Sequence, residues 1–206
     1  MRSSGKFVVV VPMLVLAVGC GPGGSGAGPG DGGEDVTPRA LAAVLVDALG
    51  EPTHAQASEG VDYYGDGAVA ATVVFGDDFA GEQVELVVAG DPPEELTSCE
   101  AAADEADGCE EVGDAVLTWD EEEPEEDPGT VTVAVPKGDA WAVATESGPS
   151  ITGDPRDLDL TVSVDDLLAL ARDPRVGPTT TAAAVAAGDA LGAWRGPDVN
   201  PDYADG

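Results

Sequence analysis

The sequence predicts an α+β fold, an antiparallel β-meander of about five or six strands covered by an N-terminal helix and two C-terminal helices. Short valine-rich segments in the middle of the chain alternate apolar and polar residues, which is typical of half-buried strands. Apolar residues recur at helical spacing only before and after those segments. The apolar content of 43% allows a folded core, and the length fits one domain better than two.

The first predicted element is a helix over residues 38–49. Thr37 can cap it, Pro38 suits its first position and Gly50 ends it. Its apolar residues recur at helical spacing and are Leu41, Val44, Leu45, Ala48 and Leu49. This pattern indicates a helix that packs with one face on a sheet.

Strands are predicted over residues 68–75, 82–89, 115–119, 130–135 and 140–145. The clearest is 130–135, in which three valines alternate with threonine and alanine, as a sheet with one polar face requires. The turn sequence PKGD that follows it predicts a hairpin. A further alternation of leucine and aspartate predicts another strand over residues 157–162.

Two helices are predicted to close the domain. Ser163 and Asp166 resemble a capping box, and they begin a helix that ends before Pro174. A last helix is predicted over residues 181–194.

The N-terminus has the layout of a secretory signal, with basic Arg2 and Lys6, an apolar run over residues 7–18 and small Gly19 before Cys20. The run is too short for a stable transmembrane helix. The sequence AVGC resembles the lipobox of bacterial lipoproteins, although alanine stands where leucine is most frequent. That resemblance implies cleavage before Cys20 and lipidation of its sulfur, with two acyl chains giving stable membrane attachment. The alternative is an ordinary cleaved signal beside a chance cysteine.

These observations predict the domain organisation. Residues 1–19 are a signal peptide, 20–36 a lipidated cysteine and glycine-rich tether, 37–196 a single α+β domain and 197–206 a flexible tail. The glycine-rich segment cannot build a core, and as a flexible chain it would reach about 20 to 24 Å. The folded domain would therefore stand just clear of the lipid headgroups.

With Cys20 lipidated, Cys99 and Cys109 are predicted to form a disulfide in an oxidising compartment. The loop between them is short, so the bridge should stabilise the fold by about 2 to 3 kcal/mol. A metal site is the alternative, but two cysteines and one distant histidine match no recognised zinc spacing. The chain has no Cys-x-x-Cys motif for redox catalysis.

Charge restricts the partners. The chain carries 8 Lys and Arg against 41 Asp and Glu, a net charge of −33, which becomes more negative when Arg2 and Lys6 leave with the signal. Such a surface repels nucleic acid and anionic headgroups, and it favours cations and basic partners. A salt-loving source would also account for this acidity.

The acidic run over residues 120–129 could collect calcium, because hard cations take several carboxylate oxygens. It lacks the spacing of an EF-hand loop, and two prolines interrupt it. The alternative is a solvated loop between strands. No other cofactor is expected, and the metal site is left unassigned.

Positive charge gathers in the last third of the chain, where Arg172 and Arg175 are candidates for holding a ligand carboxylate or phosphate. The alternative is structural: Arg172 ends a helix favourably against its dipole, and Arg175 pairs with nearby acids. His54, the single histidine, follows a helix and is expected at the surface, without an identifiable nucleophile near it.

We expect a lipid-anchored protein on the extracytoplasmic face of the cell membrane, and a non-catalytic module that binds an envelope protein or small ligand. Its composition, rich in Ala, Gly, Val and Asp, resembles lipoproteins of high-GC Gram-positive bacteria. The alternative is an extracytoplasmic hydrolase that uses paired carboxylates. A third reading is a surface protein that buffers cations.

Overall fold

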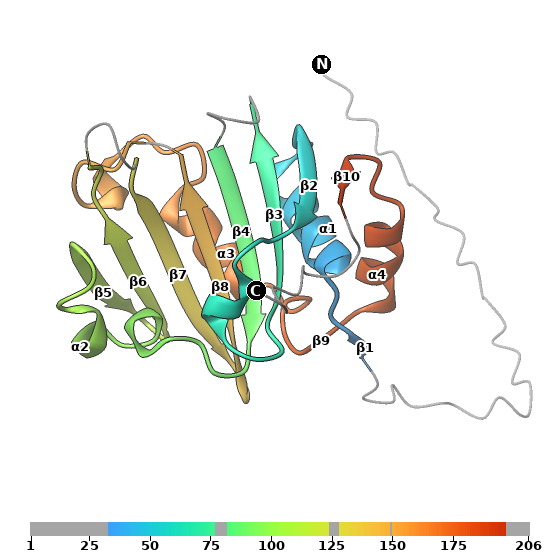
Figure 1. Ribbon diagram of the computed structural model, residues 1–206, viewed down its shortest axis with the longest axis horizontal. Helices are drawn as coiled ribbons and strands as arrows, with labels where there is room; N and C mark the ends of the chain where they lie inside the picture. Colours follow the sequence, from blue (N-terminus) through green and yellow to red (C-terminus); the bar gives the residue numbers. More distant parts are fainter. Residues whose placement is uncertain (1–32, 77–81, 124–127, 149, 197–206) are drawn as a thin grey trace, which may run out of the picture. The chain divides into compact units, whose positions relative to one another are not determined.

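The computed structural model describes residues 33–76, 82–123, 128–148 and 150–196, which form an α+β fold (Figure 1). Its main feature is an eight-stranded sheet in the order β10-β2-β3-β4-β8-β7-β6-β5. Its strands are β2 (His54–Ala57), β3 (Val69–Phe75), β4 (Glu82–Ala89), β5 (Gly108–Val112), β6 (Ala115–Asp120), β7 (Thr130–Lys137), β8 (Ala140–Ser147) and β10 (Trp194–Arg195). Among the described strands, only β10 and β2 pair in parallel. The predicted α+β class and antiparallel sheet are confirmed, with more strands than expected.

The sheet is two meanders joined side by side. Strands β2 to β4 form one and β5 to β8 form the other, and the long strands β4 and β8 pair where they meet. The register across this junction places Leu86 opposite Ala144 and Val84 opposite Glu146. The chain therefore returns to its first meander only after it has completed the second.

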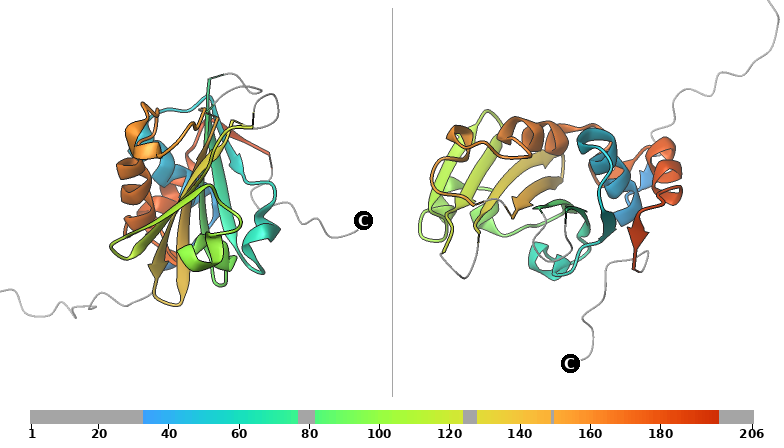
Figure 2. Two further views of the ribbon diagram at one scale, coloured as in Figure 1. Left: turned by 90° about the vertical axis from the view of Figure 1, so that its left-hand side faces the viewer. Right: turned by 90° about the horizontal axis from the view of Figure 1, so that it is seen from above.

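The helices are α1 (Pro38–Leu49), α2 (Cys99–Ala102), α3 (Val164–Arg172) and α4 (Ala182–Asp189), with 3-10 turns η1 (Val61–Tyr64), η2 (Glu94–Leu96) and η3 (Pro155–Asp157). Helices α1 and α3 lie on one face of the sheet, and η1 and α2 lie on the other (Figure 2). Helix α4 packs on α1 rather than on the sheet. Only one of the two C-terminal helices therefore covers the sheet as predicted.

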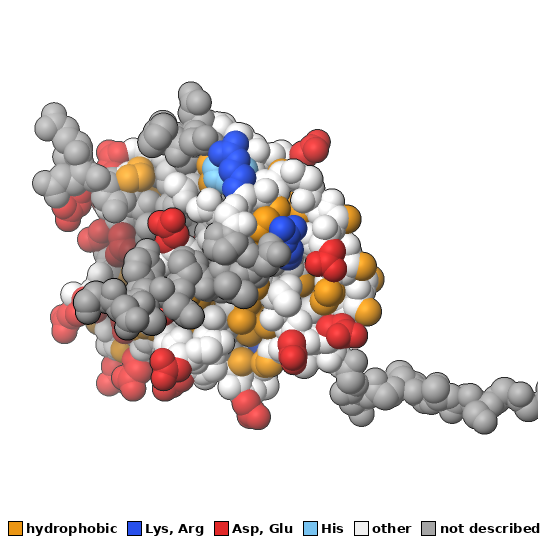
Figure 3. Space-filling model, turned by 45° about the vertical axis from the view of Figure 1, so that its right-hand side comes forward, with side chains coloured by type: hydrophobic (Ala, Val, Ile, Leu, Met, Phe, Trp, Pro, Cys, Tyr) orange, Lys and Arg blue, Asp and Glu red, His pale blue; other side chains and the backbone are white. Residues whose placement is uncertain are grey.

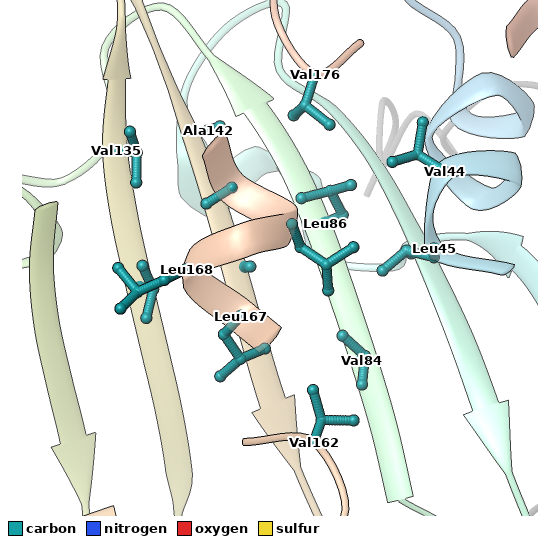
Figure 4. Packing of buried hydrophobic residues seen from close by; sticks show 14 of the residues in the cluster. Val44, Leu45, Val84, Leu86, Val135, Ala142, Val162, Leu167, Leu168 and Val176 are labelled. Atoms are coloured by element: carbon teal, nitrogen blue, oxygen red, sulfur yellow. The ribbon is translucent and has the colours of Figure 1, made fainter. Parts of the chain in front are cut away.

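The predicted caps form. Thr37 accepts the Ala40 N–H at the start of α1, and Ser163 and Asp166 complete a capping box at the start of α3. The apolar faces of these helices meet the sheet in the main core. Figure 4 shows leucines of α3 directed at strand residues, and the fully buried side chains of this core include Leu41, Leu45, Leu86, Leu117 and Leu167.

Three expectations are corrected. Residues 157–162 form no strand, because β8 already pairs with β4 and β7 and offers no free edge to the segment that follows it. The last helix ends at Asp189, and Trp194 instead pairs with Ala55 as part of β10. His54 is buried, at 6% exposure, because it lies in β2.

The domain begins earlier than predicted. Within the expected tether, β1 (Glu34–Asp35) pairs with β9 (Thr179–Thr180) in a two-stranded sheet. The predicted signal peptide 1–19, the lipidation site Cys20, most of the tether and the tail 197–206 lie outside the described residues. In the part of the chain that is described, no helix is long and apolar enough to cross a membrane.

Candidate functional site

The face of the sheet opposite α1 and α3, which we call the second face, carries a row of polar residues that runs across five strands. The pairing register aligns its members, one from each strand, which are Thr72, Glu85, Thr145, Thr132 and Thr118. The hydroxyl oxygens of Thr132 and Thr145 lie 3.0 Å apart, within hydrogen-bond distance. Cross-strand pairs of this kind stabilise a sheet, so this row first explains how the second face is held together.

Turn η1 is attached to this row by Tyr64. Its hydroxyl donates a hydrogen bond to Oε2 of Glu85 at 2.6 Å, and its ring is buried, at 8% exposure. Burial, and then the charge of Glu85, raise the pKa of the Tyr64 phenol. The phenol is therefore neutral and is a permanent donor to the carboxylate.

Beside η1 the second face is hollowed. The hollow has a volume of about 650 Å³ and is lined by residues 103–107, which follow α2, and by the facing ends of β6 and β7. Among the described residues that line it, six carry carboxylates and none is lysine or arginine; the carboxylates are Asp104, Glu105, Asp107, Asp120, Glu121 and Glu123. We call this site the acidic hollow.

A disulfide and two hydrogen bonds hold its walls. The bridge between Cys99 and Cys109 ties α2 to β5 with a Cα–Cα distance of 5.5 Å, as the sequence predicts. Asp107 accepts the Glu121 N–H at 2.8 Å. The hydroxyl of Thr130 donates to Asp120 at 3.0 Å. Three segments distant in sequence are thereby held around one space.

Tyr63 lies close enough to the acidic hollow for two of its carboxylates to affect the pKa of the Tyr63 phenol. It is the large apolar side chain most exposed in the described residues, at 54%, and its hydroxyl donates to Glu95 at 3.1 Å. Burial of part of the phenol, followed by Glu95, Asp120 and Glu105, raises its pKa to about 12. Two of these acids line the hollow, so an accessible aromatic ring and a concentration of carboxylates occur together.

This arrangement suits a cation. Each lining carboxylate is repelled by the others, and a positively charged ligand would relieve that repulsion. Within the described ranges, no three Asp, Glu, His or Cys side chains lie together in a group that could hold a metal ion. The calcium hypothesis for residues 120–129 extends into residues 124–127, which lie outside the described part, so it stays a prediction.

The two candidate arginines lie in ion pairs within the protein. Arg175 donates to Asp173 at 2.7 Å and to Asp47 at 2.8 Å. Arg172, the last residue of α3, donates to Asp114 at 2.7 Å and to a backbone carbonyl of β5. The Arg175 pairs and the position of Arg172 at the end of α3 are those of the structural alternative, and ligand binding by either arginine stays a prediction.

Two opposite effects act on the pKa of the Asp173 carboxyl group. Burial raises this pKa, but the hydrogen bonds and the charge of Arg175 lower it by more, so the pKa lies below its ordinary value. Figure 3 shows how few basic side chains stand among the acidic ones on one face of the molecule. An arginine in such a surface finds carboxylate partners close at hand.

The acidic hollow and the contacts of Tyr63 and Tyr64 are not predicted from the sequence. The acids between the two cysteines were visible as a short polar loop, but nothing local indicated that they face the end of β6 across an open space. Glu85 and Tyr64 come from separate elements, and only the sheet register brings them together. The chain matches no protein-family model, and comparisons with curated proteins and with solved structures found no match.

Proposed function

We propose that this chain is a non-catalytic binding module, anchored through Cys20 to the outer face of the cell membrane, that takes a cationic segment of an envelope protein in the acidic hollow. The observation that carries the proposal is the lining of that hollow, whose described residues include six carboxylates and no basic side chain. The size supports the same reading, because about 650 Å³ falls within the range of ligand sites.

A polypeptide segment fits better than a single ion. The carboxylates are spread over the loop after α2 and the ends of two strands, so several separate positive charges can each find a partner. Each exposed pair contributes little, about 0 to 1 kcal/mol, and affinity must come from several acting together. Tyr63 adds a ring face on which a lysine or arginine side chain can lie.

The anchor rests on the sequence. The lipobox-like AVGC at Cys20 supports attachment, and the bridge between Cys99 and Cys109 supports an oxidising compartment. Intact mass of the protein from the membrane fraction tests this half of the proposal. A chain that starts at Cys20 with added acyl mass is expected, and an unmodified chain cut elsewhere would contradict it.

Binding is tested with the soluble domain and a defined probe, a peptide of alternating lysine and glycine about ten residues long. A variant with Asp104→Asn, Glu105→Gln and Glu121→Gln removes three charges from the acidic hollow. A matched control removes three exposed charges elsewhere, at Glu51, Glu59 and Asp189. Both variants have the same net charge, so general attraction to an acidic protein affects them equally.

We expect calorimetry to show a Kd at least about tenfold weaker for the hollow variant than for the control variant, a difference of about 1.4 kcal/mol. The affinity of the wild type should fall as salt is raised, since exposed charges are screened. Equal weakening in both variants would mean that only net charge attracts the peptide. Cross-linking on intact cells then identifies the partner, and its contact segment should be basic.

A further inference from the structure

Another cavity lies at the end of the sheet where β3 begins, β4 ends and β8 begins. Its volume is about 510 Å³, within the range of ligand sites. Val69, Val88 and Ala140 form an apolar floor, and the register pairs Val69 directly with Val88. Val88 and Ala140 belong to the main core, on the face that carries α1 and α3, and Val69 packs against it. This cavity, which we call the valine pocket, is therefore separate from the acidic hollow on the second face.

Three aspartates from separate parts of the chain also line the valine pocket. Asp35 belongs to β1, Asp66 precedes β3, and Asp139 lies in the turn between β7 and β8. All three residues are exposed, and within the described part of the chain none of their carboxylates accepts a hydrogen bond or joins an ion pair. Other aspartates, such as Asp47 and Asp173, pair with an arginine. The carboxylates of the valine pocket are therefore available to a ligand.

The chemistry of this lining restricts the class of ligand. Ionised carboxylates only accept hydrogen bonds, and the other described residues of the lining have apolar side chains or, as glycines, none. An anionic ligand would be repelled, and a sugar would find no side-chain donor for its own acceptors among these residues. An ammonium group carries a positive charge and only donors, so it complements this lining.

The placement of the charges favours several ammonium groups over one metal ion. Across the described ranges, no three Asp, Glu, His or Cys side chains are grouped closely enough to hold a metal, although three aspartates line this pocket. Each aspartate can therefore meet a positive charge of its own. One exposed ion pair contributes little, so binding needs several pairs together with apolar contact. Methylene chains between the ammonium groups would lie on the valine floor, where their removal from water is favourable.

We propose that the valine pocket binds an aliphatic polyamine: the ammonium groups pair with Asp35, Asp66 and Asp139, and the methylene chains lie on the apolar floor. The inference goes beyond the proposed function, because it concerns a free small molecule and a site on the other face of the sheet. It does not depend on peptide binding in the acidic hollow.

NMR titration of the intact, methyl-labelled protein with spermidine tests the proposal. We expect saturable shifts of the Val69, Val88 and Ala140 methyl resonances, all with one Kd, because these methyl groups would contact the methylene chains. A linear diol of similar length, which has no charge, should bind at least about tenfold more weakly. Raising the salt concentration should weaken spermidine binding, since the ion pairs are exposed.

The pocket variant combines Asp35→Asn, Asp66→Asn and Asp139→Asn. The hollow variant and the control variant described above have the same net charge, so both serve as matched controls. We expect the Kd for spermidine, read from the methyl groups of the valine pocket, to be at least about tenfold weaker in the pocket variant than in either control. The lysine peptide should bind the pocket variant as tightly as the control variant, which separates this test from that of the acidic hollow.

Equal weakening in all three variants would show that net charge alone attracts spermidine, and it would overturn the proposal. Methyl shifts confined to residues outside the valine pocket, or a diol that binds as tightly as spermidine, would overturn it too. Should the pocket variant fail to fold, the methyl shifts of the wild type and its preference for spermidine over the diol decide the matter.

Discussion

Removal of the disulfide measures how much of the second face depends on a covalent constraint. Cys99 and Cys109 are separated by 10 positions and join α2 to β5. On the chain-entropy account a loop of this size restricts the unfolded chain by about 3 kcal/mol. Helix α2 has only four residues and would not be stable alone, so packing offers little to replace the bridge.

The variant is Cys99→Ala with Cys109→Ala, which leaves no free thiol from this pair. We expect urea unfolding to give a free energy of unfolding about 3 kcal/mol lower than that of the oxidised wild type. For a domain of this size that corresponds to a fall in Tm of about 10 °C. Reduced wild type is the control and should match the variant.

The same bridge holds the loop that lines the acidic hollow. Residues 103–107 follow α2 directly, so without the bridge they should exchange amide hydrogen faster, and the lysine peptide should bind more weakly. A loss of stability below about 1 kcal/mol would refute the entropic reasoning. It would mean that α2 stays in place through packing and hydrogen bonds alone.

Three other perturbations follow from single contacts. Burial raises the pKa of Glu146 from 4.5 to about 7, so its ionisation lowers the free energy of unfolding as the pH rises from about 4.5 to about 7. The Glu146→Gln variant cannot ionise. Urea unfolding should therefore show it to be more stable than the wild type by up to about 3 kcal/mol at pH 8, with no gain at pH 4. Gly188→Ala should lower Tm, because the new Cβ would lie 2.5 Å from the backbone carbonyl oxygen of Arg39 in α1. This clash should outweigh the gain in helix propensity of about 1 kcal/mol. An unchanged or raised Tm would show that α4 can shift away from α1. Arg175→Ala should cost about 1 kcal/mol or less in urea unfolding, because it removes the ion-pair partner of Asp173, and it should not weaken binding of the lysine peptide; a loss above about 2 kcal/mol would show that this pair contributes more than an exposed one.

The helices show where local pattern suffices. Thr37, Pro38 and Gly50 specify the limits of α1, and the capping box at Ser163 begins α3, because caps and breakers act within one turn of the chain. The last helix ends earlier than the sequence predicts, because alanine-rich sequence continues past Asp189. Its end is set by the pairing of Trp194 with β2, a contact between residues far apart in the sequence.

The strands show the same division. Alternation at residues 130–135 predicts β7 correctly, because two different faces demand two kinds of residue. Equal alternation at residues 157–162 predicts a strand that does not form. A strand also needs an unpaired edge, and the strand just before that segment, β8, has none to offer.

The sequence by itself determined the class of fold, the caps of two helices, the pairing of Cys99 with Cys109 and the acidic character of the surface, since each follows from composition or from residues close in the chain. Only the tertiary structure decided that β4 lies beside β8, that acids from three segments share one hollow, and that Glu146 is enclosed by valines. The reason is physical. Spacing along a chain specifies which face a side chain takes, whereas its neighbours across a sheet depend on how distant strands are ordered and aligned.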